Sequence, residues 1–372
     1  MEAYFDFKYS RVSYLGYLWL FGSGFYLTGL TTISPIYIAF SITLVVFIMR
    51  ITLGLERKIT KITFIFLILT LFSLGLMINS PINLTLNFTI SLLSPILIYI
   101  FFRDTFVNKK IIILFYFFYL ALFLTDSAWR LTHPSLDNAD KLDDLGLGYI
   151  IYKINSIMYL DSNFVGIQIV FTFSSFLYIF GRNQEIISKF LFKIIVILFF
   201  IAVLLTFSRA SILGCVIAFY FYYLLGSSNK RKLLYFSTPF IALYLYYLTQ
   251  EVSNQDISLN SKFILIDLVL KHINSIDLYD FLLGVGLGNA HNYLGMGAHN
   301  LFFTFLIEIG LIGFIIFLML IVYFIFYFKT DSLFLIFPFL IVSLSLSGTA
   351  LPYFWGILYF CVLIRNKRIL IH

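Results

Sequence analysis

Arg209 lies between two apolar runs, in the stretch 206–211, which reads TFSRAS. A guanidinium carries a rigid fork of hydrogen-bond donors that fits the oxygens of a phosphate group. The plainer interpretation is an arginine whose stem packs among apolar side chains while its head group reaches the membrane surface. Arg209 is therefore a candidate phosphate ligand, with the snorkelling role as the alternative.

A second polar stretch combines closely spaced glycines with two histidines. Gly284–Asn289 has a glycine at every second position as far as residue 288, and His291, His299 and Asn300 follow it. A dinucleotide fingerprint would need a glycine at Asn289 and a strand before the loop, so we expect no nucleotide site. A neutral histidine at a helix start can act as a general base. His299 is thus a candidate base and His291 a candidate ligand or base, while capping or packing roles remain open for such histidines.

The long apolar run 299–328 begins at His299. As a single helix it would be about 45 Å long, against about 30 Å for the hydrocarbon core of a bilayer. We therefore expect its first turns to stand in the outer aqueous layer. Glu308 would point away from His299, toward a neighbouring helix or the interface, and Gly310 and Gly313 would be sites of close helix packing.

Other polar stretches carry weaker signals. Asp161–Asn163 begins an apolar run, where Asp161 or Ser162 would cap a helix and Asn163 could contact a substrate. The acids within 137–144 could hold a cation, but their spacing matches no calcium loop, and a solvated loop is favoured. The histidines have no zinc-site spacing either.

The composition shows what must position these residues. Apolar residues make up 61% of the chain and charged residues 12%, against about 25% charged in a soluble domain. Runs of about 20 apolar residues, the length of a transmembrane helix, recur along the chain. The sequence thus predicts an all-α polytopic membrane bundle, one integral membrane domain over 1–372. About twelve spans are expected, at 12–30, 33–49, 62–79, 84–102, 111–125, 163–180, 190–207, 211–225, 233–249, 299–328, 332–347 and 352–364.

The basic residues predict the orientation of this bundle. With alternating spans, nineteen of the 25 lysines and arginines fall on the side of the N-terminus, and cytoplasmic loops carry such an excess. Both termini are therefore expected in the cytoplasm, with two long extracytoplasmic loops at 126–162 and 250–298. The basic residues left on the outer side are Arg130, Lys141, Lys153, Arg209, Lys262 and Lys271.

These motifs together resemble the superfamily of O-antigen polymerases and O-antigen ligases. The resemblance lies in Gly284–Gly288, Ala298–Asn300 and Leu306–Gly313, with Ser208–Ala210 between two spans and Asp161–Asn163 in place of an Asp-Pro-Asn element. It covers about residues 150–330 by motif and the rest by topology. The sequence departs from the family where arginines are common before the Asp-Pro-Asn element and early in the last long outer loop, because here the nearest bases are Lys153 and Lys262.

The resemblance implies a glycosyltransferase of the bacterial inner membrane, with its active face outside the cytoplasm. Such an enzyme moves a glycan from undecaprenyl diphosphate to an acceptor hydroxyl, without a metal or cofactor. Arg209, with Lys262 or Lys153, would stabilise the leaving diphosphate. His299 would deprotonate the acceptor, and Asn300 would orient His299 or the acceptor. Further candidates for substrate binding are Arg130, Asn163 and His291.

Three functions remain open at this point. A polymerase would extend a lipid-linked repeat unit, and a chain-length regulator protein is then a candidate partner. A ligase would transfer the glycan to lipid A-core. A flippase would move the lipid-linked oligosaccharide across the membrane, but transporters place ionisable groups near the bilayer midplane. The expected spans have almost none, which favours an enzyme, and no nucleic acid partner is expected.

Overall fold

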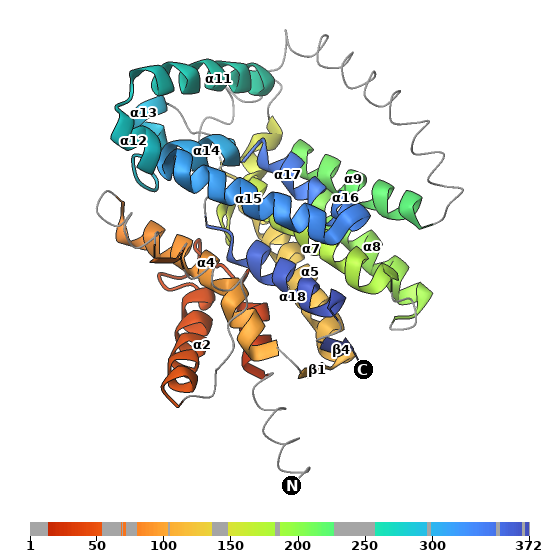
Figure 1. Ribbon diagram of the computed structural model, residues 1–372. Helices are drawn as coiled ribbons and strands as arrows, with labels where there is room; N and C mark the ends of the chain where they lie inside the picture. The colour runs from red at the N-terminus through yellow and green to blue at the C-terminus, as the bar shows by residue number, and fades with distance from the viewer. Residues whose placement is uncertain are drawn as a thin grey trace. The chain divides into compact units, whose positions relative to one another are not determined.

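The computed structural model describes residues 14–53, 68, 70–71, 80–102, 105–135, 148–182, 187–226, 257–295, 299–346, 350–366 and 369–371. Figure 1 shows the largely helical course of the chain through these residues. The described residues group into two compact units, and one membrane domain over 1–372 stays a prediction. The first falls within 1–75, 86–215 and 350–372, and the second within 76–85 and 216–349.

The first unit is a bundle of apolar helices with two small pairs of strands. Helix α7 (Ser162–Arg182) is its centre, because 89% of its most apolar segment is buried, and it packs against α5, α8 and α18. Strands β1 and β4 pair in parallel, and β2 and β3 form an antiparallel hairpin. The other elements are a helix over 14–22, α2 (Pro35–Thr52), most of α4 (Ile82–Phe102), β1 (Thr105–Val107), α5 (Lys109–Thr132), η2 (Gly148–Tyr152), β2 (Ile154–Ser156), β3 (Leu160–Asp161), α8 (Lys189–Leu204), the first part of α9 (Arg209–Leu225), α18 (Pro352–Arg365) and β4 (Ile369–Ile371).

Helix α5 is longer than the sequence predicts. Its expected span ended at residue 125, but the helix continues to Thr132. Asn108 caps its start by accepting a hydrogen bond from the backbone N–H of Lys110 at 2.9 Å, the usual role of asparagine at that position. The extension carries Arg130 out of the expected outer loop and into the last turn of a packed helix.

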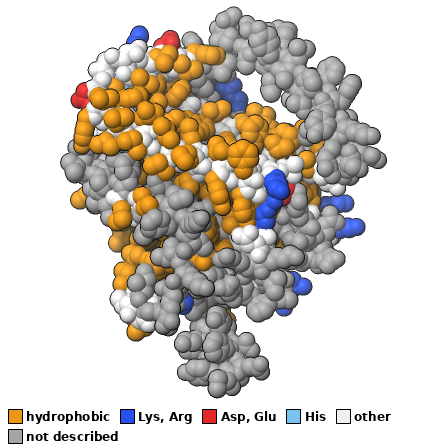
Figure 2. Space-filling view, in the orientation of Figure 1, with side chains coloured by type: hydrophobic (Ala, Val, Ile, Leu, Met, Phe, Trp, Pro, Cys, Tyr) orange, Lys and Arg blue, Asp and Glu red, His pale blue; other side chains and the backbone are white. Residues whose placement is uncertain are grey.

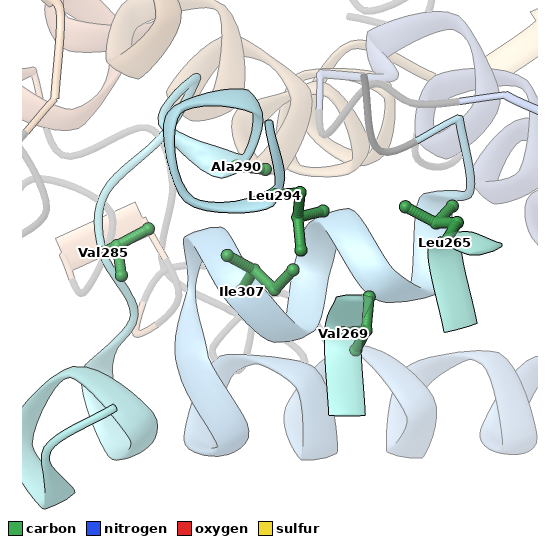
Figure 3. Packing of buried hydrophobic residues seen from close by; sticks show 6 residues of the cluster. All are labelled: Leu265, Val269, Val285, Ala290, Leu294 and Ile307. Atoms are coloured by element: carbon green, nitrogen blue, oxygen red, sulfur yellow. The ribbon is translucent and has the colours of Figure 1, made fainter. Parts of the chain in front are cut away.

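The second unit contains the predicted outer segment 250–298, and its described part is helical rather than an extended loop. Helices α11 and α13 contact each other, and their buried side chains form one cluster with Val285 and Ile307 (Figure 3). The elements of this unit include α11 (Ile257–Ser275), α12 (Leu278–Leu283), α13 (Ala290–Leu294), α14 (Leu301–Glu308), α15 (Gly310–Phe328), η3 (Lys329–Asp331), α16 (Ser332–Leu335) and α17 (Phe337–Ser343).

The run 299–328 is not one helix, contrary to the expectation from its length. Helix α14 ends at Glu308, and Gly310 has a positive φ of 67° where α15 begins. The rings of Phe305 and Phe317 stack with their centroids 4.2 Å apart. In a straight helix, residues twelve positions apart would lie about 18 Å apart along the axis. The chain therefore folds back at Gly310, and α14 packs beside α15.

The structure agrees with a multi-pass membrane protein. In the described part of the chain, four helical stretches are long and apolar enough to cross a membrane: 82–102, 109–132, 162–181 and 310–335. Shorter apolar helices cover 35–50, 209–225 and 352–365. The expected span at 233–249 and nearly all of that at 62–79 lie outside the described residues. The number of spans, the side of each terminus and the sidedness of the loops stay predictions.

The surface fits this interpretation. On the face shown in Figure 2, hydrophobic side chains predominate among the described residues and charged ones are sparse. Large apolar side chains such as Ile82, Phe190 and Phe326 are more than 70% exposed. Soluble monomers rarely expose contiguous apolar surface on a large scale, so this surface is what a protein in contact with lipid would have.

Candidate functional site

The starts of α7 and α9 lie side by side in the first unit. The hydroxyl of Ser162 donates a hydrogen bond of 2.7 Å to the carbonyl of Thr206. A β-carbon on Gly166 would lie 2.8 Å from the Cβ of Ser211, so glycine is needed for this close approach. Two motifs separated by more than 40 residues, Asp161–Asn163 and Ser208–Ala210, therefore meet.

Lys153 joins this place through the backbone. Its carbonyl accepts a hydrogen bond of 2.9 Å from the N–H of Ser162, next to the pairing of Ile154 with Asp161 in the β2–β3 hairpin. Burial lowers the pKa of the Lys153 ammonium; Asp161 opposes this, while the cations Arg209 and Arg130 lower it further. The Lys153 side chain is half-buried and that of Arg209 is exposed.

Asp161 and Asn163 belong to the helix start itself. The carboxylate of Asp161 accepts hydrogen bonds from the backbone N–H of Asn163 at 2.8 Å and from its side-chain Nδ2 at 3.2 Å. The capping role predicted for Asp161 is thus confirmed. The Asn163 amide lies against Asp161, with its side chain half-buried.

Arg130 lies deeper than its expected role as a substrate ligand would suggest. Its side chain is fully buried and forms an ion pair with Asp126, with Nε 2.9 Å from Oδ2. Its terminal nitrogens donate to the carbonyl of Tyr152 at 2.7 Å, to the hydroxyl of Ser127 at 3.0 Å and to the carbonyl of Leu205 at 3.0 Å. Four donors of the guanidinium are therefore used by the protein itself.

Asp126 was missed by the sequence analysis, which placed it at the start of a loop. Its Oδ1 accepts hydrogen bonds from the hydroxyl of Ser156 and from the backbone N–H groups of Ile157 and Met158. An acid and an arginine four residues apart at the end of an apolar run indicate an ion pair on one helix face. That spacing could have identified the pair.

In the second unit, the backbone of the glycine-rich loop forms hydrogen bonds with the last residues of α14, just before the break between α14 and α15. The N–H of Val285 donates to the carbonyl of Ile307 at 2.9 Å, and the N–H of Gly286 donates to that of Glu308 at 3.1 Å. Gly310 lies where α15 packs closely on α12, as expected of a glycine between helices, and its neighbours there are the backbones of Leu282 and Gly284. The glycine motif and the motif around residues 306–313 therefore form one backbone junction.

Glu308 is buried and finds a partner at the start of a neighbouring helix, which is one of the two positions predicted for it, whereas the alternative of exposure at an interface is wrong. Its carboxyl accepts hydrogen bonds from the backbone N–H groups of Gly288 and Ala290. Burial raises the pKa of this carboxyl to about 7, and the two N–H groups oppose the shift. Glu308 lies before the candidate span that starts at Gly310. Its carboxyl is hydrogen-bonded to the glycine-rich loop and to the start of α13.

The predicted histidines and Asn300 also belong to the second unit. His299 and His291 are exposed, and Nδ1 of His291 lies 2.8 Å from the carbonyl of Gly288. Asn300 caps α14, because its Oδ1 accepts from the N–H groups of Phe302 and Phe303. His299 thus directly precedes a capped helix of eight residues rather than beginning a long one.

Lys262 lies on α11, and its side chain falls outside the described residues. The structure therefore brings together Lys153, Arg209, Asp161 and Asn163 in one unit. His291, His299 and Asn300 belong to the other unit.

Two cations near one carboxylate can bind an anion that carries more than one negative charge. Among the described residues, no group of three or more His, Cys, Asp and Glu side chains is placed to hold a metal ion. Cys215 and Cys361 are buried free thiols. Comparisons of the chain with protein-family models, with curated proteins and with solved structures find no match.

Proposed function

We propose that this protein is a glycosyltransferase of the O-antigen polymerase type. It would transfer a glycan from undecaprenyl diphosphate to a lipid-linked repeat unit on the outer side of the bacterial inner membrane. The observation that carries the proposal is the convergence of Lys153 and Arg209 where α7 and α9 begin. These residues are far apart in the sequence. Arg209 lies in a motif that resembles this superfamily, whereas Lys153 is the nearest base before the Asp161–Asn163 element, where the family often has arginines.

The chemistry of the reaction explains the need for such a cation pair. The acceptor hydroxyl oxygen bonds to the anomeric carbon, and the bond between that carbon and the phosphate oxygen breaks. The diphosphate leaves with both electrons of the broken bond, so negative charge grows on its oxygens. Cations already in place stabilise that charge without reorganisation. Attack from the side opposite the diphosphate inverts the anomeric centre.

The proton of the acceptor hydroxyl needs a base, and we assign that role to His299. Its side chain is exposed, so it is accessible to an acceptor. A positioned base typically contributes about 10²–10⁴ to the rate. Asn300 would keep the backbone at His299 in place through its cap on α14.

The experiment uses the full chain in nanodiscs with a synthetic lipid-diphosphate-linked repeat unit. Arg209→Ala should abolish polymer formation, and Arg209→Lys should be partly active at best, since an ammonium lacks the planar fork that binds phosphate oxygens bidentately. Lys271→Ala, which removes an exposed base on α11, is the matched control and should behave as wild type. Full activity of Arg209→Ala would refute the assignment of Arg209.

The products distinguish the related functions. Growth of the glycan on the lipid diphosphate identifies a polymerase. Transfer to lipid A-core only would identify a ligase, and movement of unaltered units across the membrane a flippase. A chain-length regulator would change the length of the polymer and would leave its linkage unaltered.

A further inference from the structure

The buried guanidinium of Arg130 joins the two backbone segments that carry the cations of the candidate site. It donates to the carbonyl of Tyr152, the residue before Lys153, at 2.7 Å. It also donates to the carbonyl of Leu205, four residues before Arg209, at 3.0 Å. One planar group therefore contacts both segments.

Asp126 completes this arrangement from the same helix. Its Oδ2 pairs with Nε of Arg130 at 2.9 Å, which orients the guanidinium. Its Oδ1 accepts from the backbone N–H of Ile157 at 3.0 Å and from the hydroxyl of Ser156. The hairpin that follows Lys153 is thereby held to α5 as well.

We propose that Arg130 is a positioning residue, which sets the spacing of Lys153 and Arg209 without touching the anion they bind. The donors of a guanidinium have a fixed geometry, so two carbonyls bound to it are fixed relative to each other. Both charged side chains are fully buried, where hydrogen bonds are strong and an unpaired group is costly.

The geometry of the candidate site therefore depends on Arg130, which is buried and does not contact the anion. A shift of about 1 Å in a group that binds substrate can reduce the rate about 10²-fold. Lysine at position 130 keeps the charge but has a single ammonium, which cannot reproduce the planar fork. The conservative replacement should therefore impair the site.

The test uses the full chain in nanodiscs with inorganic pyrophosphate as the probe. Arg130→Lys and Arg130→Ala should bind pyrophosphate at least about tenfold more weakly than wild type. Amide hydrogen exchange at 152–158 and 205–210 should become faster in both variants. Arg209→Ala should lose affinity while exchange at 152–158 stays as in wild type.

Chemical rescue tests the geometry itself. Millimolar guanidinium should restore both the affinity and the slow exchange in Arg130→Ala, whereas potassium at equal ionic strength should not. The potassium arm is needed because salt alone weakens anion binding. Rescue would also show that Arg130→Ala is folded. If Arg130→Ala is unfolded, Arg130→Lys supplies the same comparison.

Two results would overturn the proposal. Unchanged exchange in both segments would show that Arg130 does not hold them. Weaker binding with unchanged exchange and no rescue would instead make Arg130 a direct ligand of the anion. Only the pyrophosphate-binding measurement rests on the proposed function. If wild type does not bind pyrophosphate, the proposed anion site fails while hydrogen exchange still decides whether Arg130 joins the segments.

Discussion

Gly284 and Gly310 are in backbone contact, and neither position has room for a side chain. A β-carbon on Gly284 would lie 2.5 Å from the backbone nitrogen of Gly310, and one on Gly310 would lie 2.5 Å from the carbonyl oxygen of Leu282. Both glycines have positive φ, 87° and 67°. The fold of the second unit therefore requires glycine at both positions, for steric and conformational reasons together.

Alanine at either glycine should destabilise the second unit strongly. Gly295 provides the matched control, because it has a φ of 66° but a β-carbon there would have nothing within 4 Å. Gly295→Ala should cost only the left-handed conformation, about 1–2 kcal/mol. Gly284→Ala and Gly310→Ala should lower the thermal unfolding temperature clearly further. Equal effects at all three positions would show that the close approach is unimportant.

Glu308 should make the stability of the second unit depend on pH. Burial raises the pKa of its carboxyl to about 7 from an ordinary value of 4.5. Between these values the folded state binds more protons than the unfolded state, so stability present at low pH is lost as the pH rises toward 7. The loss should be on the order of 3 kcal/mol. Glu308→Gln should remove this component in unfolding measured at pH 5 and pH 8.

The comparison is made as a difference between wild type and Glu308→Gln at each pH. Other titrating groups, including His272, whose pKa is lowered by burial against the influence of Asp280, then contribute equally to both proteins. Identical pH profiles would contradict the buried state of Glu308.

The pKa of Lys153 should change when its charged neighbours are replaced. Arg209→Gln removes a cation that lowers the pKa of Lys153, so that pKa should rise. Asp161→Asn removes the carboxylate that raises it, so the pKa should fall further. NMR titration of methylated lysine would measure both shifts, with Lys271→Ala as the control. Shifts of the same sign would show that the three groups do not form one site.

The affinity for pyrophosphate should depend on the protonation state of Lys153. In the proposed site the anion binds the charged ammonium of Lys153, so the affinity for pyrophosphate should decrease as the pH rises through the lowered pKa of that group. Lys153→Arg keeps the charge at all relevant pH values and should remove that decrease. Calorimetry across the pH range would measure it. An unchanged profile in Lys153→Arg would exclude Lys153 from the site.

His299→Ala distinguishes the proposed base from an exposed histidine without function. We expect a loss of about 10²–10⁴ in rate, measured on gels of the glycan. In cells, loss of a polymerase leaves single units on the outer leaflet, whereas loss of a ligase leaves long polymer on the lipid diphosphate. Loss of a flippase would trap units on the cytoplasmic leaflet. His133→Ala is the control, since His133 stacks on Trp129 with ring centroids 3.8 Å apart. Normal chains from His299→Ala would remove it from the mechanism.

Several features of the fold could be predicted from local sequence. The apolar runs became helices over most of the expected ranges, such as α4, α7 and α18, because hydrophobicity and length act within each segment. The cap at Asp161 was also predictable, since it involves neighbouring residues only. The reversal at Gly310 was not, because a long apolar run looks the same whether the chain continues or folds back.

The order of residues alone is enough to predict a helical membrane protein and to show which polar motifs break its apolar runs. Which of those polar groups meet depends on how the chain folds. Arg130 was predicted to lie in an outer loop, and Glu308 to face a neighbouring helix or the interface. Charged groups such as these are buried only when they are paired. Their partners, the carbonyls of Tyr152 and Leu205 and the N–H groups of Gly288 and Ala290, come from segments distant in the chain. Hydrogen bonds to backbone atoms carry no side-chain signature, so their positions emerge only when the chain is folded.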